Sequence, residues 1–214
     1  MLTWIGWDRA RTAMRLFLRV SLSIALPFTL MSVAVSANAA QSAPTAVELV
    51  RELGSVQTSD AAAAQLRKLA NTDEATRNYL AAILPIIIQY GPRPPSEAWS
   101  HAVELSGDLK IVEATPALAR WLDAETGGDV VFLADEENLL RCSPCMALSQ
   151  IGDPSIPSVQ AVLAHGKTSE RWRAAFVLNK IGSVRARGAL RKHLVEGDSD
   201  NGLVDYIRKV TSNR

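Results

Sequence analysis

The sequence has few of the residues from which catalytic and metal sites are built. Its 214 residues include two cysteines and three histidines, and no H-x-x-x-H or H-E-x-x-H spacing occurs. The G-x-S-x-G, P-loop and G-x-G-x-x-G motifs are also missing. These absences argue against a zinc site, a serine hydrolase and a nucleotide-binding enzyme. We therefore expect His101, His165 and His193 to be solvated or to lie in turns.

Strand signals are equally scarce. Alternation of apolar and polar residues is absent, and the run at 130–133 is the only short segment that would pair as a strand. Apolar residues recur instead at helical spacing, which predicts an all-α chain. The expected helices are about 46–53, 61–70, 73–90, 96–106, 115–125, 137–151, 156–164, 170–181, 185–195 and 202–211. The helix that ends near 125 begins either at Thr115 or near Leu109, in which case Pro116 kinks it.

Local signals indicate where some of these helices begin and end. Thr45 and Glu48 have the spacing of a capping box, and Gly54 suits the left-handed position after the helix that they open. Ser96 is expected to cap a later helix. Pro85 lies inside a long apolar helix, which it should bend because its ring displaces a carbonyl and removes a donor.

The N-terminus has the pattern of a secretory signal peptide. Four arginines precede the stretch Val20–Val47, which has no charged side chain, and Ala37–Ala39 supplies small residues for cleavage. The apolar run is shorter than the roughly 20 residues of a membrane span. We therefore expect residues 1–39 to be removed and the protein to be periplasmic or secreted. Translation from Met14 would leave a signal of more ordinary length than translation from Met1.

The remaining chain is nearly neutral. Residues 1–39 hold four arginines and one aspartate, so 19 basic and 21 acidic side chains are left. This balance gives no electrostatic argument for nucleic acid or anionic lipid as a partner. After cleavage we expect no stable membrane span.

Two segments near the C-terminus, 30 residues apart, share nearly the same residue pattern. Arg141–Gly152 and Arg171–Gly182 share an arginine, six residues and then Leu-x-x-Ile-Gly. Each is followed by a second apolar segment, which ends at Leu163 in the first and at Leu194 in the second. A fixed period of this size indicates a repeat array of helix pairs, in which neighbouring pairs stack because one pair cannot bury its apolar face alone.

These two units resemble HEAT repeats, of the armadillo-type α-solenoid class found in exported bacterial proteins. The resemblance is clearest over 135–165 and 168–197, and a diverged unit lies around 105–122. It implies an α-α superhelix of about four to five helix pairs spanning 40–214. It also implies structural roles for five turn and loop residues, which are Arg141, Gly152, Asp153, Arg171 and Gly182.

Cys142 and Cys145 are the most reactive candidates. Their C-x-x-C spacing with an internal proline resembles the redox site of thioredoxin-like proteins. No βαβ pattern surrounds them, however, and their repeat counterparts are Trp172 and Ala175. Four interpretations remain open, namely a structural disulfide, a redox pair, a metal site with Met146 nearby and two buried thiols. Pro144 should kink the helix that carries them.

The leading hypothesis is a non-enzymatic scaffold of the bacterial cell envelope, without cofactor, that binds another protein. Its groove would be lined by the second helices of successive units. Trp99, Trp121 and Trp172 are candidate anchors if they are exposed. The alternative is a thiol-disulfide or metal-handling protein that uses Cys142 and Cys145. A third hypothesis, from fold analogy alone, is a HEAT-type lyase-like protein that modifies a partner.

Overall fold

Helices account for all the regular structure that the computed structural model describes, in residues 44–91, 96–122 and 141–212. The prediction of an all-α chain is therefore confirmed for these ranges. All of them belong to one unit, Ala43–Arg214. The run at 130–133, the N-terminal signal segment and the first residues of the expected helix over 137–151 lie outside the described residues.

The described helices follow one another with short connections. They are α2 (Ala46–Glu52), α3 (Ser59–Thr72), α4 (Glu74–Tyr90), α5 (Glu97–Asp108), the 3-10 helix η1 (Val112–Ala114), α6 (Thr115–Arg120), α8 (Ser143–Ile151), the 3-10 helix η3 (Asp153–Ser155), α9 (Ile156–His165), α10 (Thr168–Ile181), α11 (Val184–Glu196) and α12 (Asn201–Ser212).

Side-chain caps begin several of these helices, as the sequence predicts. The Glu48 N–H donates to the Thr45 hydroxyl at 3.3 Å, and the Thr45 N–H donates to the Glu48 carboxylate at 2.8 Å, which completes the capping box of α2. Ser96 caps α5 by accepting from the Trp99 N–H. Helix α4 runs through Pro85 and ends at Tyr90.

Two glycines make the turns inside the matching units. Gly152, after α8, has φ 81°, and Gly182, after α10, has φ 64°. Glycine alone adopts such angles without strain, so each turn can be tight. Gly54 was expected to do the same after α2, but positive φ is found among the described glycines only at 152, 182 and 197. The chain leaves α2 instead through Leu53 in a right-handed conformation.

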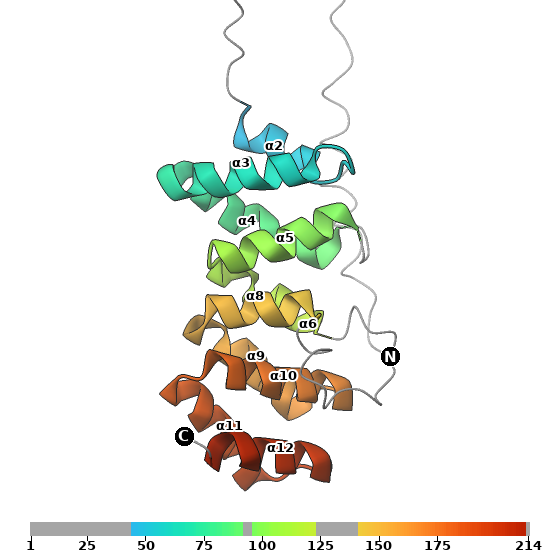
Figure 1. Ribbon diagram of the computed structural model, residues 1–214, viewed down its shortest axis with the longest axis vertical. Helices are drawn as coiled ribbons and strands as arrows, with labels where there is room; N and C mark the ends of the chain where they lie inside the picture. The colour runs from blue at the N-terminus through green and yellow to red at the C-terminus, as the bar shows by residue number, and fades with distance from the viewer. Residues whose placement is uncertain (1–43, 92–95, 123–140, 213–214) are drawn as a thin grey trace, which may run out of the picture. The chain divides into compact units, whose positions relative to one another are not determined.

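The helices from α3 onward pack in two sets, and contacts such as those of α4 with α5, α6 with α8 and α9 with α10 join one set to the other (Figure 1). The first set is α3, α5, α8, α10 and α12, and the second is α4, α6, α9 and α11. Within the first set, α3 contacts α5, α5 contacts α8, α8 contacts α10 and α10 contacts α12. In the second set, α4 contacts α6, α6 contacts α9 and α9 contacts α11.

The core runs between the two sets as one continuous cluster. Leu148 and Leu178, the repeated leucines of the matching units, have no exposed surface. Burying a leucine contributes about 1.5–3 kcal/mol to stability. Because each helix pair contributes to the same cluster, the core supports the surfaces on both sides of it.

Candidate functional site

Cys142 and Cys145 are joined by a disulfide, with their sulfurs 2.13 Å apart and their Cα atoms 5.2 Å apart. Cys142 is the N-cap of α8, and its sulfur accepts the Cys145 N–H at 3.3 Å. The pair was expected in the middle of a helix over 137–151. Instead α8 begins after Cys142, so the disulfide lies at the positive end of the helix.

The predicted kink at Pro144 is wrong for the same reason. Pro144 is the second residue of α8, where its missing N–H would have had no partner within the helix. The rule that proline is tolerated in the first turn is the signal that would have placed the start of α8 correctly.

Burial separates this disulfide from solvent. Cys142 is 2% exposed and Cys145 is fully buried. Both cysteines belong to the core cluster. An incoming thiol must reach a sulfur atom for exchange to occur. In this conformation the disulfide therefore has the surroundings of a structural crosslink, and neither sulfur is available as a thiolate for a metal.

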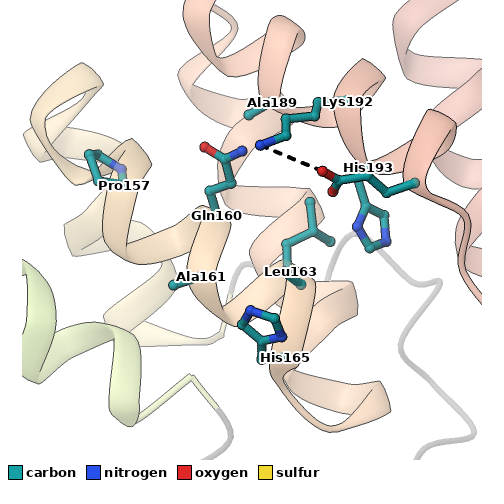
Figure 2. Close-up of a pocket in the computed structure, with 10 residues that line it drawn as sticks. Pro157, Gln160, Ala161, Leu163, His165, Ala189, Lys192 and His193 are labelled. Carbon is teal, nitrogen blue, oxygen red and sulfur yellow. Dashed lines mark ion pairs between the residues drawn. The ribbon is translucent and has the colours of Figure 1, made fainter.

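A cavity of about 530 Å³ lies between α9 and α11, the second helices of the two matching units (Figure 2). We call it the α9–α11 groove. Its walls combine small apolar side chains with a few polar ones. The lining residues are Pro157, Gln160, Ala161, Leu163, Ala164, His165, Ala189, Lys192, His193 and Glu196.

Alanines give the groove its depth. Ala161 and Ala164 on α9 face the groove together with Ala189 on α11. Side chains of this size leave space between two packed helices that larger ones would fill. Lys192 and Glu196 form an ion pair at 3.5 Å, marked by the dashed line in Figure 2, and their side chains are 61% and 52% exposed. The groove thus combines apolar lining, of which Leu163 and Ala189 are buried, with a solvated polar edge.

His193 joins the groove to a buried polar network. Its Nε2 lies 2.7 Å from the Asp198 carboxylate, which also lies 3.4 Å from the Arg171 guanidinium. The Asp198 carboxylate further accepts the Asp200 N–H at 2.8 Å, and its side chain is only 1% exposed. Arg171 comes from the start of α10, so the network ties the loop after α11 to the preceding helix pair.

The ionised form of Asp198 is favoured by these contacts. Burial by itself would raise the pKa of Asp198, but the hydrogen bonds from the Asp200 N–H and the His193 ring outweigh it. The positive charges of Arg171 and His193 add to this effect, so the pKa is lowered below its ordinary value. Because the carboxylate is ionised, the His193 ring nitrogen is the donor in their hydrogen bond.

The other residues with predicted structural roles lie in turns. Asp153 begins η3, and Arg141 is exposed just before α8. Sequence reasoning missed Ser155, whose buried hydroxyl donates toward the carbonyls of Leu148 and Gly152. A serine in a turn gives little signal for such a role, because its side chain bonds equally well to water.

Of the three candidate tryptophans, two are core residues and one lies at the edge of the core. Trp99 and Trp172 are buried, and Trp121 is half-buried and packs against the core. Trp99 and Trp121 form an edge-to-face pair with centroids 6.3 Å apart. The Trp172 indole N–H donates to Asp200 at 2.8 Å. Trp99 and Trp172 thus lack the exposure on which a partner-binding role depends.

The histidines differ from expectation in two cases out of three. His165 is exposed at the end of α9, but His101 and His193 are buried. His165 and His193, from different units, line the same groove. The ring of His101 lies 3.5 Å from the Asp60 carboxylate and 3.7 Å from that of Glu97. Among the described residues no group of three or more His, Cys, Asp or Glu could hold a metal ion.

The opposite side of the unit carries a different arrangement. There Arg67 on α3 pairs with Asp108 at 2.6 Å and with Glu104 at 3.4 Å, both on α5. These residues border a smaller cavity of about 270 Å³, which also reaches Met146 on α8. Its charges are paired within the chain.

Arg173 is a buried cation that the sequence did not reveal. It lies within α10 and its guanidinium donates to the Leu122 carbonyl, at the end of the α6 segment. This hydrogen bond joins α10 to the segment that follows α6. A buried arginine is uncommon and needs partners, and periodicity alone did not separate it from solvated arginines.

Comparison with known proteins finds no relative. No protein-family model, no curated protein and no solved structure matches this chain. In the described part of the chain, no helix is both long and apolar enough to cross a membrane.

Proposed function

We propose that this protein is a HEAT-like α-α superhelix that binds another protein in the α9–α11 groove. The observation that carries the proposal is the position of that groove. It lies between the second helices of the two matching units, which is where a repeat array of this kind binds partners. The contacts of successive helices within each set support the superhelical arrangement.

The anatomy of the groove suits a protein partner. Binding interfaces combine an apolar centre with a polar, solvated edge. Here three alanines and Leu163 supply apolar lining, and Gln160, Lys192 and Glu196 supply polar lining. The Asp198 network beneath His193 holds one wall in place, so little ordering would be needed on binding. Among the described residues that line the groove there is no serine, threonine or cysteine to act as a nucleophile beside a base, and we propose binding without catalysis.

Site-specific photocrosslinking tests the proposal. A photoreactive amino acid at Gln160, inside the groove, should capture a discrete partner in the envelope of the producing cells. Gln65, exposed on α3, provides the matched control at a glutamine outside the groove. Equal capture from both positions, or none from position 160, would contradict binding in this groove.

The proposed location is the bacterial periplasm or the exterior, reached after removal of residues 1–39. The charge-free stretch that follows Arg19 and the small residues at 37–39 support it. Intact mass of the protein recovered from the envelope should match a chain beginning at Ala40. A cytosolic protein that keeps Met1 or Met14 would exclude this location.

One observation favours thiol-disulfide chemistry as a second candidate. Cys142 caps α8, and a helix N-terminus stabilises a thiolate. Burial of both sulfurs opposes it. The rate at which reduced glutathione opens the disulfide separates the two functions. A structural crosslink should react far more slowly in the folded protein than in the unfolded chain, whereas a redox site should react readily when folded.

A further inference from the structure

The groove has an uneven charge distribution that indicates what kind of segment it accepts. Helix α9 contains no aspartate, glutamate, lysine or arginine. Helix α11 contains four basic residues and one acidic residue, Glu196. The near neutrality of the whole chain therefore hides a local excess of positive charge beside the groove.

Two of the basic residues lie on the side of α11 that borders the groove. Lys192 lines it directly. Arg185 precedes Ala189, another lining residue, by four positions, so the two lie on the same face of the helix. Arg191 lies on another side of α11, and Arg187 donates to the Gly182 carbonyl that ends α10.

These two cations remain available to a partner. Arg185 is exposed and makes no ion pair with the residues that the structure describes. Lys192 pairs with Glu196, but both side chains are more than half exposed. An exposed pair contributes little and exchanges readily with another carboxylate.

We propose that the α9–α11 groove binds an acidic peptide segment of a partner protein through an apolar side chain and neighbouring carboxylates. The apolar side chain would enter between Ala161, Ala164 and Ala189, and the carboxylates would reach Arg185 and Lys192. This inference rests on the proposed function and specifies the partner's chemistry. A concave site of about 530 Å³ favours an inserted peptide chain over a flat membrane surface.

Binding of defined peptides to the full mature protein tests this directly. The probe is a short fluorescein-labelled peptide of glutamate and leucine, followed by fluorescence anisotropy. Two matched peptides replace glutamate by glutamine or leucine by alanine. We expect the glutamate–leucine peptide to bind most tightly, and its advantage over the glutamine peptide to shrink as salt is added.

Two charge variants locate the site. Arg185→Gln with Lys192→Gln should weaken binding of the glutamate–leucine peptide by about two- to thirtyfold, the effect of losing two exposed ion pairs. The same variant should leave the glutamine peptide unaffected. Lys68→Gln with Lys209→Gln removes the same charge from exposed positions on α3 and α12 and should change neither. All four side chains are exposed, so thermal unfolding should show that both variants fold.

The inference is overturned if the acidic peptide binds no more tightly than the glutamine peptide, or if both charge variants weaken it equally. It is also overturned if binding of phosphatidylglycerol vesicles or of single-stranded DNA requires Arg185 and Lys192 while binding of the peptide does not. Crosslinking at Gln160 distinguishes failure of the acidic-segment proposal from failure of the proposed protein binding in the groove. If a partner is captured at Gln160 but the charge of Arg185 and Lys192 has no effect on peptide binding, the acidic segment is contradicted and binding in the groove is retained. If neither partner capture nor charge-dependent peptide binding is observed, the proposed function is contradicted as well.

Discussion

The Asp198 carboxylate lies 2.7 Å from Nε2 of His193, and both side chains are almost completely buried. Asp198 belongs to the loop after α11 and His193 to the wall of the groove. With Arg171 at 3.4 Å, this contact connects three consecutive elements of the C-terminal region. We therefore regard the network as the support of the groove rather than as part of its binding surface.

Replacing Asp198 by asparagine should destabilise the protein by about 1.5–3 kcal/mol. Asparagine keeps an acceptor for the Asp200 N–H but removes the charge that faces Arg171 and His193, and hydrogen bonds to charged groups are worth about this much. Chemical unfolding measures the change. Asp205→Asn is the control, because its pair with Arg208 is solvent-exposed and its loss should cost within roughly 0.5 kcal/mol. A similar small effect at both positions would argue against a structural role for the network.

The stability that Asp198 contributes should disappear in acid. Its pKa in the folded protein is lowered, while in the unfolded chain it titrates near the ordinary value of 3.8. The contribution is therefore complete above the unfolded pKa and is lost as the pH falls through the lower, folded pKa. The difference in unfolding free energy between the native protein and Asp198→Asn should therefore shrink as the pH falls below about 4. A difference that grows on acidification would contradict this assignment.

The cap at Cys142 can be separated from the disulfide. Cys142→Ser with Cys145→Ala removes the bond but keeps an N-cap oxygen, whereas Cys142→Ala with Cys145→Ala removes both. The serine variant should be more stable by about 1 kcal/mol, the usual value of an N-cap. Unfolding in denaturant under identical conditions compares them. Equal stability would mean that the sulfur of Cys142 does not act as a cap.

The disulfide bond itself should stabilise the fold less than a disulfide that closes a longer loop. It closes a very small loop, so chain entropy predicts less than the approximately 3 kcal/mol of a 15-residue loop. Loss of the disulfide should leave groove binding intact, because neither cysteine lines the groove. Loss of binding in the serine variant, with the fold preserved, would favour the redox alternative.

The sequence predicted that the chain is helical and where several turns lie, but it placed the start of α8 wrongly. The capping box at Thr45 and the turn at Gly182 depend on residues close in the chain, so local patterns were sufficient, although they wrongly placed a left-handed residue at Gly54. The start of α8 was misplaced because aligning Cys142 with Trp172 assumed equal helix lengths in both repeats. Helix α10 already begins at Thr168, four residues before Trp172, whereas α8 begins one residue after Cys142.

The sequence indicated which helices would border a groove, but not which side chains would support it. The repeat pattern indicated that second helices would face one another, and α9 and α11 do so. It did not indicate that His193 would be buried against Asp198, because that contact depends on how the loop after α11 folds back. The same limit applied to the tryptophans, for which spacing alone did not decide between the core and the surface.

Two glycines inside helices provide a test of helix packing, because their replacement by alanine should change the stability of the protein in opposite directions. A Cβ at Gly107 on α5 would lie 2.8 Å from Cα and 3.2 Å from Cβ of Ala147 on α8, and would also collide with the Gln150 side chain. A Cβ at Gly188 on α11 would meet no atom within 4 Å. Gly107→Ala should therefore destabilise by about 1–3 kcal/mol through overpacking. Gly188→Ala should stabilise by about 0.5–1 kcal/mol, because alanine loses less backbone entropy in a helix.

Thermal and chemical unfolding of the two variants measure both effects. The comparison is matched, since each change adds one methyl group to a helix. If α5 and α8 cross as closely as the structure has them, the two changes must differ in sign. A stabilising Gly107→Ala would mean that this crossing is wider, and the contact between the second and third helix pairs would then have to be revised.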